Sequence, residues 1–497
     1  MTLVPANPAA SATLPRDINI AGLGLAGALL ALLLARRGHR VTVFERRPDP
    51  RLAGAESGRS INLALAARGI RALERAGIMD QVWPLLIAMR GRMVHGTPAH
   101  ADEAAQPPQL QPYGQRPHEV IHSVGRGQLN TLLIEAVARH PEVTLHFDTG
   151  ITGVDLEQGT LGVRHLPSRE LRTVPLGFTF ATDGAGSVVR HALAACGHIE
   201  AREDPLDHGY KELMLPARTD CAGNAQFALE PHALHIWPRR GYMLIALPNP
   251  DRSFTVTLFL PQAATPTAGL PDSDSATPGA AAKTTTAATA SFAALRTDAD
   301  VDAFFQREFP DVKALIPDLT AQFATHAQGH LGTVHARPWA AGPVLLLGDA
   351  AHAIVPFHGQ GMNAAFEDCV LLDDILHDPA NTGTPWPELF RKFEASRRPD
   401  TEAIASLSLD NYAEMRSDVL DPKFVRQKAL GLELERRFPD RFIPEYAMVM
   451  FHPRIAYADA QRRGRLQQRI LDQLDEARLP DGAPDFALAR RLIAEHL

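Results

Sequence analysis

Residues 344–369 read VLLLGDAAHAIVPFHGQGMNAAFEDC, which predicts a buried strand, a Gly-Asp turn and a helix that begins among glycines. The strand would end at Gly348 and deliver the carboxylate of Asp349 at its carboxyl end, where ligands bind in open α/β sheets. The backbone N–H groups around Gly361 and Asn363 would favour negative charge at the helix start. The carboxylate could accept a hydrogen bond from a ribityl hydroxyl of a flavin, and the helix start could stabilise the negative charge of a reduced flavin ring. Together they indicate a flavin site. An ordinary strand, turn and helix is the alternative.

A glycine fingerprint near the amino terminus gives the second signal. Residues 17–47, DINIAGLGLAGALLALLLARRGHRVTVFERR, predict a strand, a helix and a strand, with Gly22, Gly24 and Gly27 in G-x-G-x-x-G spacing. These glycines would permit a tight turn, let the backbone approach a pyrophosphate, and allow close packing of helix on strand. Glu45, after the second strand, is placed for an adenosine ribose hydroxyl. The segment therefore predicts a dinucleotide-binding fold.

The same segment allows a membrane span as an alternative. Between residues 18 and 35 only Asn19 is polar, and about twenty apolar residues suffice to cross a bilayer. The glycines at fingerprint positions and the following VTVFE strand favour the dinucleotide fold.

A third motif, an Asp-Gly pair, lies between the glycine fingerprint and the Gly-Asp turn in the chain. Residues 181–193, ATDGAGSVVRHAL, place Asp183 and Gly184 after a predicted strand, with Arg190 in the next helical turn. A lone Asp-Gly pair is also a common turn. The order of glycine fingerprint, Asp-Gly motif and Gly-Asp motif resembles the flavin-dependent aromatic hydroxylases. In that family one FAD fills the Rossmann site, and the nicotinamide cofactor has no Rossmann domain of its own.

Within that group the chain resembles the kynurenine 3-monooxygenase family, and the resemblance covers nearly the whole chain. The matching blocks are GRSINLALAARGIRALE (58–74), MRGRMVHG (89–96), HSVGRGQLN (122–130), LHIWPRRGYMLIALPN (234–249), NYAEMR (411–416) and FPDRFIPEYAMV (438–449). The bacterial members are the nearer match, because His358 stands where animal members carry Phe. NYAEMR and FPDRFIPEYAMV lie outside the flavin motifs, so they bear on the substrate.

The resemblance implies a set of site residues. Arg92 would bind the substrate carboxylate, since a planar guanidinium grips a carboxylate with two hydrogen bonds. The implied substrate contacts are Arg92, Tyr113, Asn411, Glu414 and Tyr446, with Phe357, His358 and Met415 in the pocket. The residues expected at FAD are Gly22, Gly24, Gly27, Glu45, Ala64, Arg126, Ile151, Asp183, Asp349, Gly361, Met362 and Asn363.

The resemblance also implies the chemistry. NADPH would reduce FAD, and O₂ would add to give a C4a-hydroperoxyflavin that hydroxylates L-kynurenine to 3-hydroxy-L-kynurenine. The cofactor carries the hard step, so no metal and no side-chain nucleophile are expected. One alternative is an FAD-dependent hydroxylase of another aromatic acid. A second, of a different class, is a nucleotide-binding regulatory protein without redox chemistry.

The expected fold class is α/β: a Rossmann-like FAD-binding domain with an inserted β-sheet substrate domain and a C-terminal helical region. The FAD-binding domain would be discontinuous, at residues 17–196 and 335–380, because the two motif halves must meet around one cofactor. Residues 197–334 would form the sheet that covers the substrate, and residues 381–497 the helical region. The small, Thr- and Pro-rich residues 264–290 predict a mobile insert, and residues 1–16 a disordered tail.

Composition agrees with these expectations. A chain of 497 residues with 45% hydrophobic content can bury more than one core. The net charge of −7 argues against a nucleic-acid partner. Three scattered cysteines, no signal peptide and a short, charged carboxyl end predict a cytoplasmic protein without an integral membrane segment. The sequence leaves the oligomeric state open, a homodimer included.

Overall fold

The computed structural model describes residues 16–52, 62–96, 107–239, 241–263, 290–417, 419, 421–477, 479 and 483–497. The expected tail at 1–16 and the expected insert at 264–290 lie outside these residues, apart from Arg16 and Ala290.

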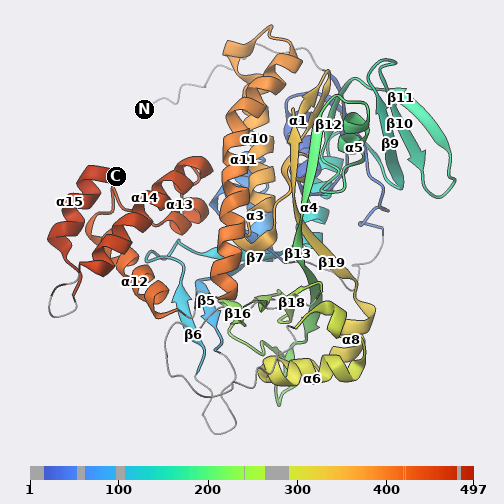
Figure 1. Cartoon of the computed structure of the whole chain (residues 1–497). Coiled ribbons are helices and arrows are strands. Elements are labelled where there is room, and N and C mark those ends of the chain that lie inside the picture. Colours follow the sequence, from blue (N-terminus) through green and yellow to red (C-terminus); the bar gives the residue numbers. More distant parts are fainter. Residues whose placement is uncertain are drawn as a thin grey trace, which may run out of the picture.

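A six-stranded sheet, parallel except at one edge, forms the first layer of the fold (Figure 1). Its strands are, in spatial order, β20 (Ala340–Ala341), β21 (Val344–Leu346), β12 (Phe178–Ala181), β1 (Asp17–Ala21), β2 (Arg40–Phe44) and β8 (Val143–His146). Because β12 pairs in parallel with both β1 and β21, the glycine fingerprint, the Asp-Gly motif and the Gly-Asp motif meet at one edge of the sheet.

Helices cover this sheet. α1 (Leu25–Arg36) packs against α4 (Arg126–Ala138) and α10 (Gly361–His377), while α5 (Val188–Ala195) follows β12. The apolar run after the fingerprint is explained by burial, since Leu29, Leu30 and Leu34 of α1 are fully enclosed. Such a helix, apolar on every side, belongs to a protein core or a membrane. Within the described ranges, no helix is long and apolar enough to span a bilayer.

A seven-stranded sheet forms the second layer (Figure 1). Its order is β19 (Gln328–Arg337), β13 (Glu200–Leu215), β18 (Phe254–Pro261), β17 (Met243–Pro248), β16 (Leu234–Pro238), β5 (Gly91–Val94) and β6 (Gln109–Pro112). The strand β18 is buried along its whole length instead of alternating in exposure. The reason is that α6 (Asp298–Glu308), α7 (Pro310–Lys313) and α8 (Leu319–Thr325) pack a phenylalanine-rich core against it.

β5 and β6 join this second sheet, although they belong in sequence to the first stretch of the expected FAD-binding domain. β5 pairs in parallel with β16, and Arg92 lies opposite Leu234. The chain therefore crosses between the layers before residue 196. The domain boundaries given above remain our proposal.

Two three-stranded sheets complete the β structure: β9 (Thr149–Asp155), β10 (Thr160–His165) and β11 (Leu171–Pro175) form one, and β3 (Asn62–Leu65), β4 (Ile87–Met89) and β7 (Ile121–Gly125) the other. A two-stranded ribbon joins β14 (Arg218–Thr219) and β15 (Ala225–Gln226). The short helices α2 (Ala67–Arg75) and α3 (Met79–Val82) lie between β3 and β4 in the chain.

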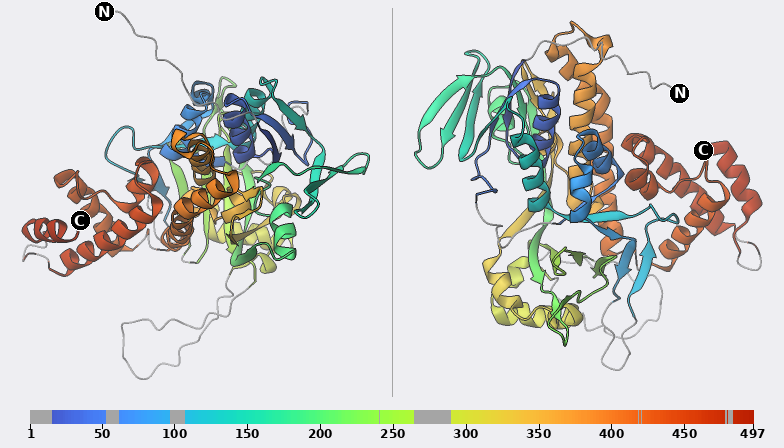
Figure 2. Two further views of the ribbon diagram at one scale, coloured as in Figure 1. Left: turned by 90° about the horizontal axis from the view of Figure 1, so that it is seen from above. Right: turned by 180° about the vertical axis from the view of Figure 1, so that it is seen from behind.

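The carboxyl half of the chain is helical. α9 (Asp349–His352) and a 3₁₀ turn (Pro356–His358) lead into α10, which runs beside the long α11 (Trp386–Arg416). The last helices are α12 (Pro422–Arg437), α13 (Glu445–Phe451), α14 (Tyr457–Glu476) and α15 (Phe486–His496). Figure 2 shows them gathered on one side of the molecule, away from the β9–β11 sheet.

Candidate active site

A cavity of about 650 Å³ is lined by residues of both large sheets. Gly24 and Gly184 reach it from the six-stranded sheet, Arg92 from β5, and Met415 and Tyr446 from the helical region. A volume of this size is typical of cofactor and ligand sites. The three flavin motifs and the substrate motifs predicted from the sequence therefore border one space.

Two of the three fingerprint glycines, Gly22 and Gly27, are required by close packing. Gly22 has φ of +92°, and a Cβ there would lie 2.9 Å from the Asp183 Cα. At Gly27 a Cβ would lie 2.1 Å from the carbonyl oxygen of Gly22. A Cβ on Gly24, in contrast, would meet no described atom within 4 Å, and Gly24 lines the cavity. Gly24 is thus the fingerprint position at which backbone is open to a ligand.

Glu45 is buried at the end of β2 and fixes the fingerprint turn. Its Oε2 accepts a hydrogen bond of 2.7 Å from the Leu23 N–H, and its Oε1 accepts one of 2.9 Å from the Arg47 N–H. Burial opposes the charge, but the Arg47 and Leu23 contacts outweigh it and hold the pKa of Glu45 below its ordinary value. The carboxylate is therefore ionised beside the turn, although Glu45 does not itself line the cavity.

Three helices begin at the cavity without a side-chain cap. The cap residues are Gly24 for α1, Gly125 for α4 and Gln360 for α10, and none of them has a side chain that accepts a hydrogen bond from the first N–H groups of its helix. The first residues of these helices, including Arg126 and Gly361, line the cavity. Uncapped N–H groups with the positive ends of three helix dipoles form a site for an anion such as a diphosphate.

The Gly-Asp turn is held from behind by a buried carboxylate that the sequence did not single out. Asp368 on α10 accepts hydrogen bonds from the Gly348 N–H (3.2 Å), His352 (2.6 Å) and Arg397 (2.6 Å). Burial disfavours its charge, but His352 and Arg397 lower the pKa of Asp368 to about 2. An acid inside the apolar run FEDCVLL was the available signal, since buried charges are paired. His352 is thus a structural residue, while Asp349 faces the cavity.

At the other end of the cavity, a charged pair meets aromatic side chains. The buried guanidinium of Arg92 donates to Glu414 and, at 2.9 Å, to Asn411 Oδ1, both on α11. Burial disfavours the charge of Arg92, yet Glu414 raises its pKa above the ordinary value. Tyr446 lies under the guanidinium at 4.9 Å from its ring centroid and stacks on Tyr113 at 5.5 Å.

Three buried polar atoms beside this pair lack a hydrogen-bond partner among the described residues. They are Arg92 Nε, the Tyr113 hydroxyl and His358 Nδ1. Buried polar groups are almost always satisfied in native proteins, so three orphans around one cavity point to a polar ligand. Burial, with a smaller contribution from the charge of Arg92, lowers the pKa of His358 to about 4. His358, stacked on Tyr446 at 5.2 Å, is therefore neutral.

The predicted site residues divide into those that line the cavity and those that hold them. The lining residues are Gly24, Ala64, Arg92, Tyr113, Arg126, Asp349, Phe357, His358, Gly361, Met362, Met415 and Tyr446. Asn411 and Glu414 reach it through Arg92, and Asn363 braces its wall by bonding the Ala66 N–H. Gly22, Gly27, Glu45 and Asp183 lie just behind the lining. Ile151, on β9, is half-buried and packs on one side against the core, and its contact with FAD stays a prediction.

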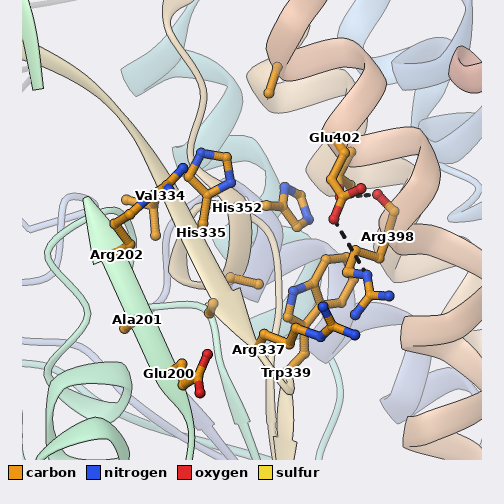
Figure 3. A pocket seen from close by; sticks show the side chains of 14 residues that line it. Glu200, Ala201, Arg202, Val334, His335, Arg337, Trp339, His352, Arg398 and Glu402 are labelled. Atoms are coloured by element: carbon orange, nitrogen blue, oxygen red, sulfur yellow. Dashed lines mark hydrogen bonds and ion pairs between the residues drawn. The ribbon is translucent and has the colours of Figure 1, made fainter. Parts of the chain in front are cut away.

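A second cavity of about 410 Å³ lies between β13, β19 and α11 (Figure 3). Its charged side chains largely pair with one another or with neighbours. Arg398 contacts Glu402 at 3.5 Å, and Arg202 bonds Asp204 at 2.7 Å. It borders neither a fingerprint glycine nor Arg92, so we place the functional site in the larger cavity.

Comparisons with known proteins agree with this geometry. A family described as FAD binding domain matches residues 16–262 and 291–408. The chain is 44% identical over 459 residues to the kynurenine 3-monooxygenase of Stenotrophomonas maltophilia, spanning 92% of this chain and 91% of that protein. It is 40% identical over 485 residues to the kynurenine 3-monooxygenase of Myxococcus xanthus, and the match spans 97% of this chain and 95% of that protein.

Among solved structures, 2-methyl-3-hydroxypyridine-5-carboxylic acid oxygenase is similar with a TM-score of 0.59 and 18% identity, covering 84% of this chain and 96% of that chain. At this identity, the likeness shows a shared fold.

Proposed function

The chain belongs to the kynurenine 3-monooxygenase family of FAD-dependent monooxygenases, and on this premise we propose that it hydroxylates L-kynurenine to 3-hydroxy-L-kynurenine with NADPH and O₂. FAD, when bound, supplies the reducing and oxygen-activating chemistry. The chain's own residues bind the substrate, orient its ring and exclude water.

The pairing of Arg92 with Glu414 is the observation that carries the substrate assignment. One cation and one anion at the same end of a cavity complement an α-amino acid, which bears a carboxylate and an ammonium group. Arg92 would hold the carboxylate through its unpartnered Nε, and Glu414 would accept a hydrogen bond from the ammonium. An aromatic acid without an amino group would leave Glu414 unmatched.

The remainder of the cavity suits an aromatic ring. Apolar and aromatic side chains line it from the seven-stranded sheet and the helices, among them Leu234, Ile245, Phe259, Phe357 and Met450. Such walls exclude water from the reacting ring. The cofactor residues proposed from the sequence would then hold FAD along the fingerprint, with the uncapped helix starts facing its diphosphate.

The runner-up function is hydroxylation of an aromatic acid that lacks the amino group. We would measure NADPH oxidation by the FAD-loaded protein with L-kynurenine, with its analogue lacking the α-amino group, and with 4-hydroxybenzoate. Stimulation by L-kynurenine well above the other two supports the proposal. Equal or stronger stimulation by an acid without the amino group would replace it with the runner-up.

A redox-inactive regulatory protein is the alternative from another class. Bound yellow flavin that NADPH reduces would exclude it, whereas a chain that binds FAD and stays oxidised under NADPH would favour it. We also propose a cytoplasmic, reducing environment, which the three free cysteines Cys196, Cys221 and Cys369 support. A homodimer is compatible with the proposal and does not bear on the site.

A further inference from the structure

Residues 356–362, which we call the cavity segment, join the 3₁₀ turn to α10 and face the cavity with all but one residue. The lining members are Pro356, Phe357, His358, Gly359, Gly361 and Met362. The exception is Gln360, whose fully buried side chain contacts the C-terminal helices α13 and α14 instead. Gln360 is therefore the side chain by which the cavity segment is attached to those helices.

Both ends of the Gln360 amide are held. Tyr457 of α14 donates its hydroxyl hydrogen to Gln360 Oε1 at 2.7 Å, and Gln360 Nε2 donates to Met450 Sδ of α13 at 3.0 Å. Gln360 is also the cap residue of α10, but its side chain does not cap the first N–H groups of its own helix. Because Tyr457 and Met450 engage the amide, those N–H groups are left for a ligand in the cavity.

Tyr457 is in turn held between two arginines. The centroid of its buried ring lies 3.9 Å from the guanidinium carbon of Arg68 and 5.6 Å from that of Arg397. Both arginines pair with Glu367, at 2.6 and 2.7 Å, and Arg397 also bonds Asp368, which holds the Gly-Asp turn. Burial raises the pKa of the Tyr457 hydroxyl above its ordinary value, so the hydroxyl keeps its proton and remains a donor. One cluster thus supports both turns that border the cavity.

The cavity segment spans the two parts of the site. His358 stacks on Tyr446 at the substrate end, whereas Gly361 and Met362 are among the residues proposed to contact FAD. The position of the segment therefore sets the distance between the substrate ring and the flavin ring. A displacement of about 1 Å between reacting groups can lower a rate by about 100-fold.

We infer that Tyr457 is a positioning residue: its hydroxyl, acting through Gln360, fixes the cavity segment at the separation that hydroxylation requires. The inference rests on the proposed function. Tyr457 does not itself line the cavity, so it acts on the reaction only through the residues that it holds. When the segment is displaced, NADPH, a proton and O₂ give NADP⁺ and hydrogen peroxide, and L-kynurenine is left unchanged.

The first test removes one hydroxyl group. Tyr457→Phe keeps the ring between the two arginines and leaves Gln360 Oε1 without its donor. The matched control is Tyr242→Phe, whose half-buried ring packs on Phe304 at 5.9 Å and does not line the cavity. With FAD-loaded protein we would measure hydrogen peroxide and hydroxylated product per NADPH, together with KM and Tm.

The fraction of NADPH recovered as hydrogen peroxide should rise about fivefold in Tyr457→Phe, the size of one lost buried hydrogen bond. The KM for L-kynurenine should stay within about twofold of the parent value, because Arg92 and its partners are untouched. A merely structural role would lower Tm and leave the peroxide fraction unchanged. Tyr242→Phe should keep the parent peroxide fraction.

A second measurement does not depend on turnover. Amide hydrogen exchange in a peptide covering residues 356–362 reports local opening of the cavity segment. Exchange there should be about fivefold faster in Tyr457→Phe and unchanged in Tyr242→Phe. Gln360→Met should reproduce both effects of Tyr457→Phe, and the double variant should add nothing further, because the two residues act through one hydrogen bond.

A parent peroxide fraction or parent exchange in Tyr457→Phe would overturn the inference while the proposed function stands. Effects of Tyr457→Phe and Gln360→Met that sum in the double variant would overturn it as well. Should Tyr457→Phe fail to fold, Gln360→Met decides by the same two measurements. If the parent protein leaves L-kynurenine unchanged, the proposed function fails and the inference fails with it.

Discussion

The guanidinium of Arg92 is bonded to the carboxylate of Glu414, so a strand of the second sheet is joined to the carboxyl end of α11 at the wall of the cavity. The two residues are 322 positions apart in the chain. Glu414 keeps about a quarter of its side chain exposed, at 27%, whereas Arg92 keeps 2%. The pair is therefore open on the carboxylate side.

Arg92→Ala should raise the KM for L-kynurenine by roughly 100-fold. The variant removes the cation that binds the substrate carboxylate and leaves the Glu414 carboxylate without its partner, and the loss of such a pair costs about 3 kcal/mol of binding free energy. FAD content should not change, since the side-chain hydrogen bonds of Arg92 go to Glu414 and Asn411. Steady-state kinetics and flavin absorbance test this, with the exposed neighbour Arg90→Ala as the control. Parent kinetics in Arg92→Ala would remove Arg92 from the site.

Gly24→Ala and Gly27→Ala should fail in different ways. A methyl at Gly24 meets no described atom, so the fold should survive while the methyl blocks the approach of FAD to the backbone. At Gly27 the methyl would lie 2.6 Å from Thr182 Oγ1 as well as against the Gly22 carbonyl, which should cost about 2 kcal/mol or more of stability. Thermal unfolding and FAD titration separate the two. Parent FAD affinity in Gly24→Ala would contradict the placement of the cofactor.

The fold was predictable where its signals are local. Gly22, Gly24 and Gly27 specify a turn between neighbouring elements, and the run before Asp349 specifies a buried strand, so both could be recognised in the sequence. The pairing of β5 with β16 joins residues far apart in the chain, and no local pattern encodes it. The sequence therefore indicated which side chains serve the site, while the crossing of β5 and β6 into the second sheet required the structure.

The same distinction applies within the site. Arg92 and Glu414 could each be named through the family resemblance, but their ion pair depends on the tertiary fold. Ile151, expected at FAD, is half-buried and does not line the cavity, and its contact with FAD stays a prediction.

His358→Phe should leave the pH profile of turnover unchanged from about pH 5.5 upwards. An exposed imidazole has a pKa of about 6.5, but burial lowers the pKa of His358 to about 4, so the residue is neutral throughout that range. The variant should instead release a larger fraction of NADPH oxidation as hydrogen peroxide, because Phe cannot supply the polar atom that Nδ1 offers. An acid limb near pH 6.5 that disappears in the variant would show that His358 titrates after all.

Glu445→Gln should stabilise the protein at pH 8 and not at pH 5. Burial raises the pKa of Glu445 to about 7, with Asp410 and Glu414 adding to the shift. The folded chain therefore keeps a proton that the unfolded chain releases above pH 4.5, and the stability that this proton gives is lost as the pH rises through 7. Glutamine removes the charge, so Tm at pH 8 should increase by roughly 2–4 °C. The control is Glu433→Gln, which should show no such gain, because the partly exposed Glu433 carboxylate pairs with Arg436 and Arg437.

The most direct measurement is NADPH oxidation by the purified, FAD-loaded protein with and without L-kynurenine, with the product identified by mass. We predict that L-kynurenine accelerates NADPH oxidation and gains one oxygen atom, in the position that defines 3-hydroxy-L-kynurenine. No acceleration by L-kynurenine, or acceleration in which it is recovered unchanged, would contradict the account.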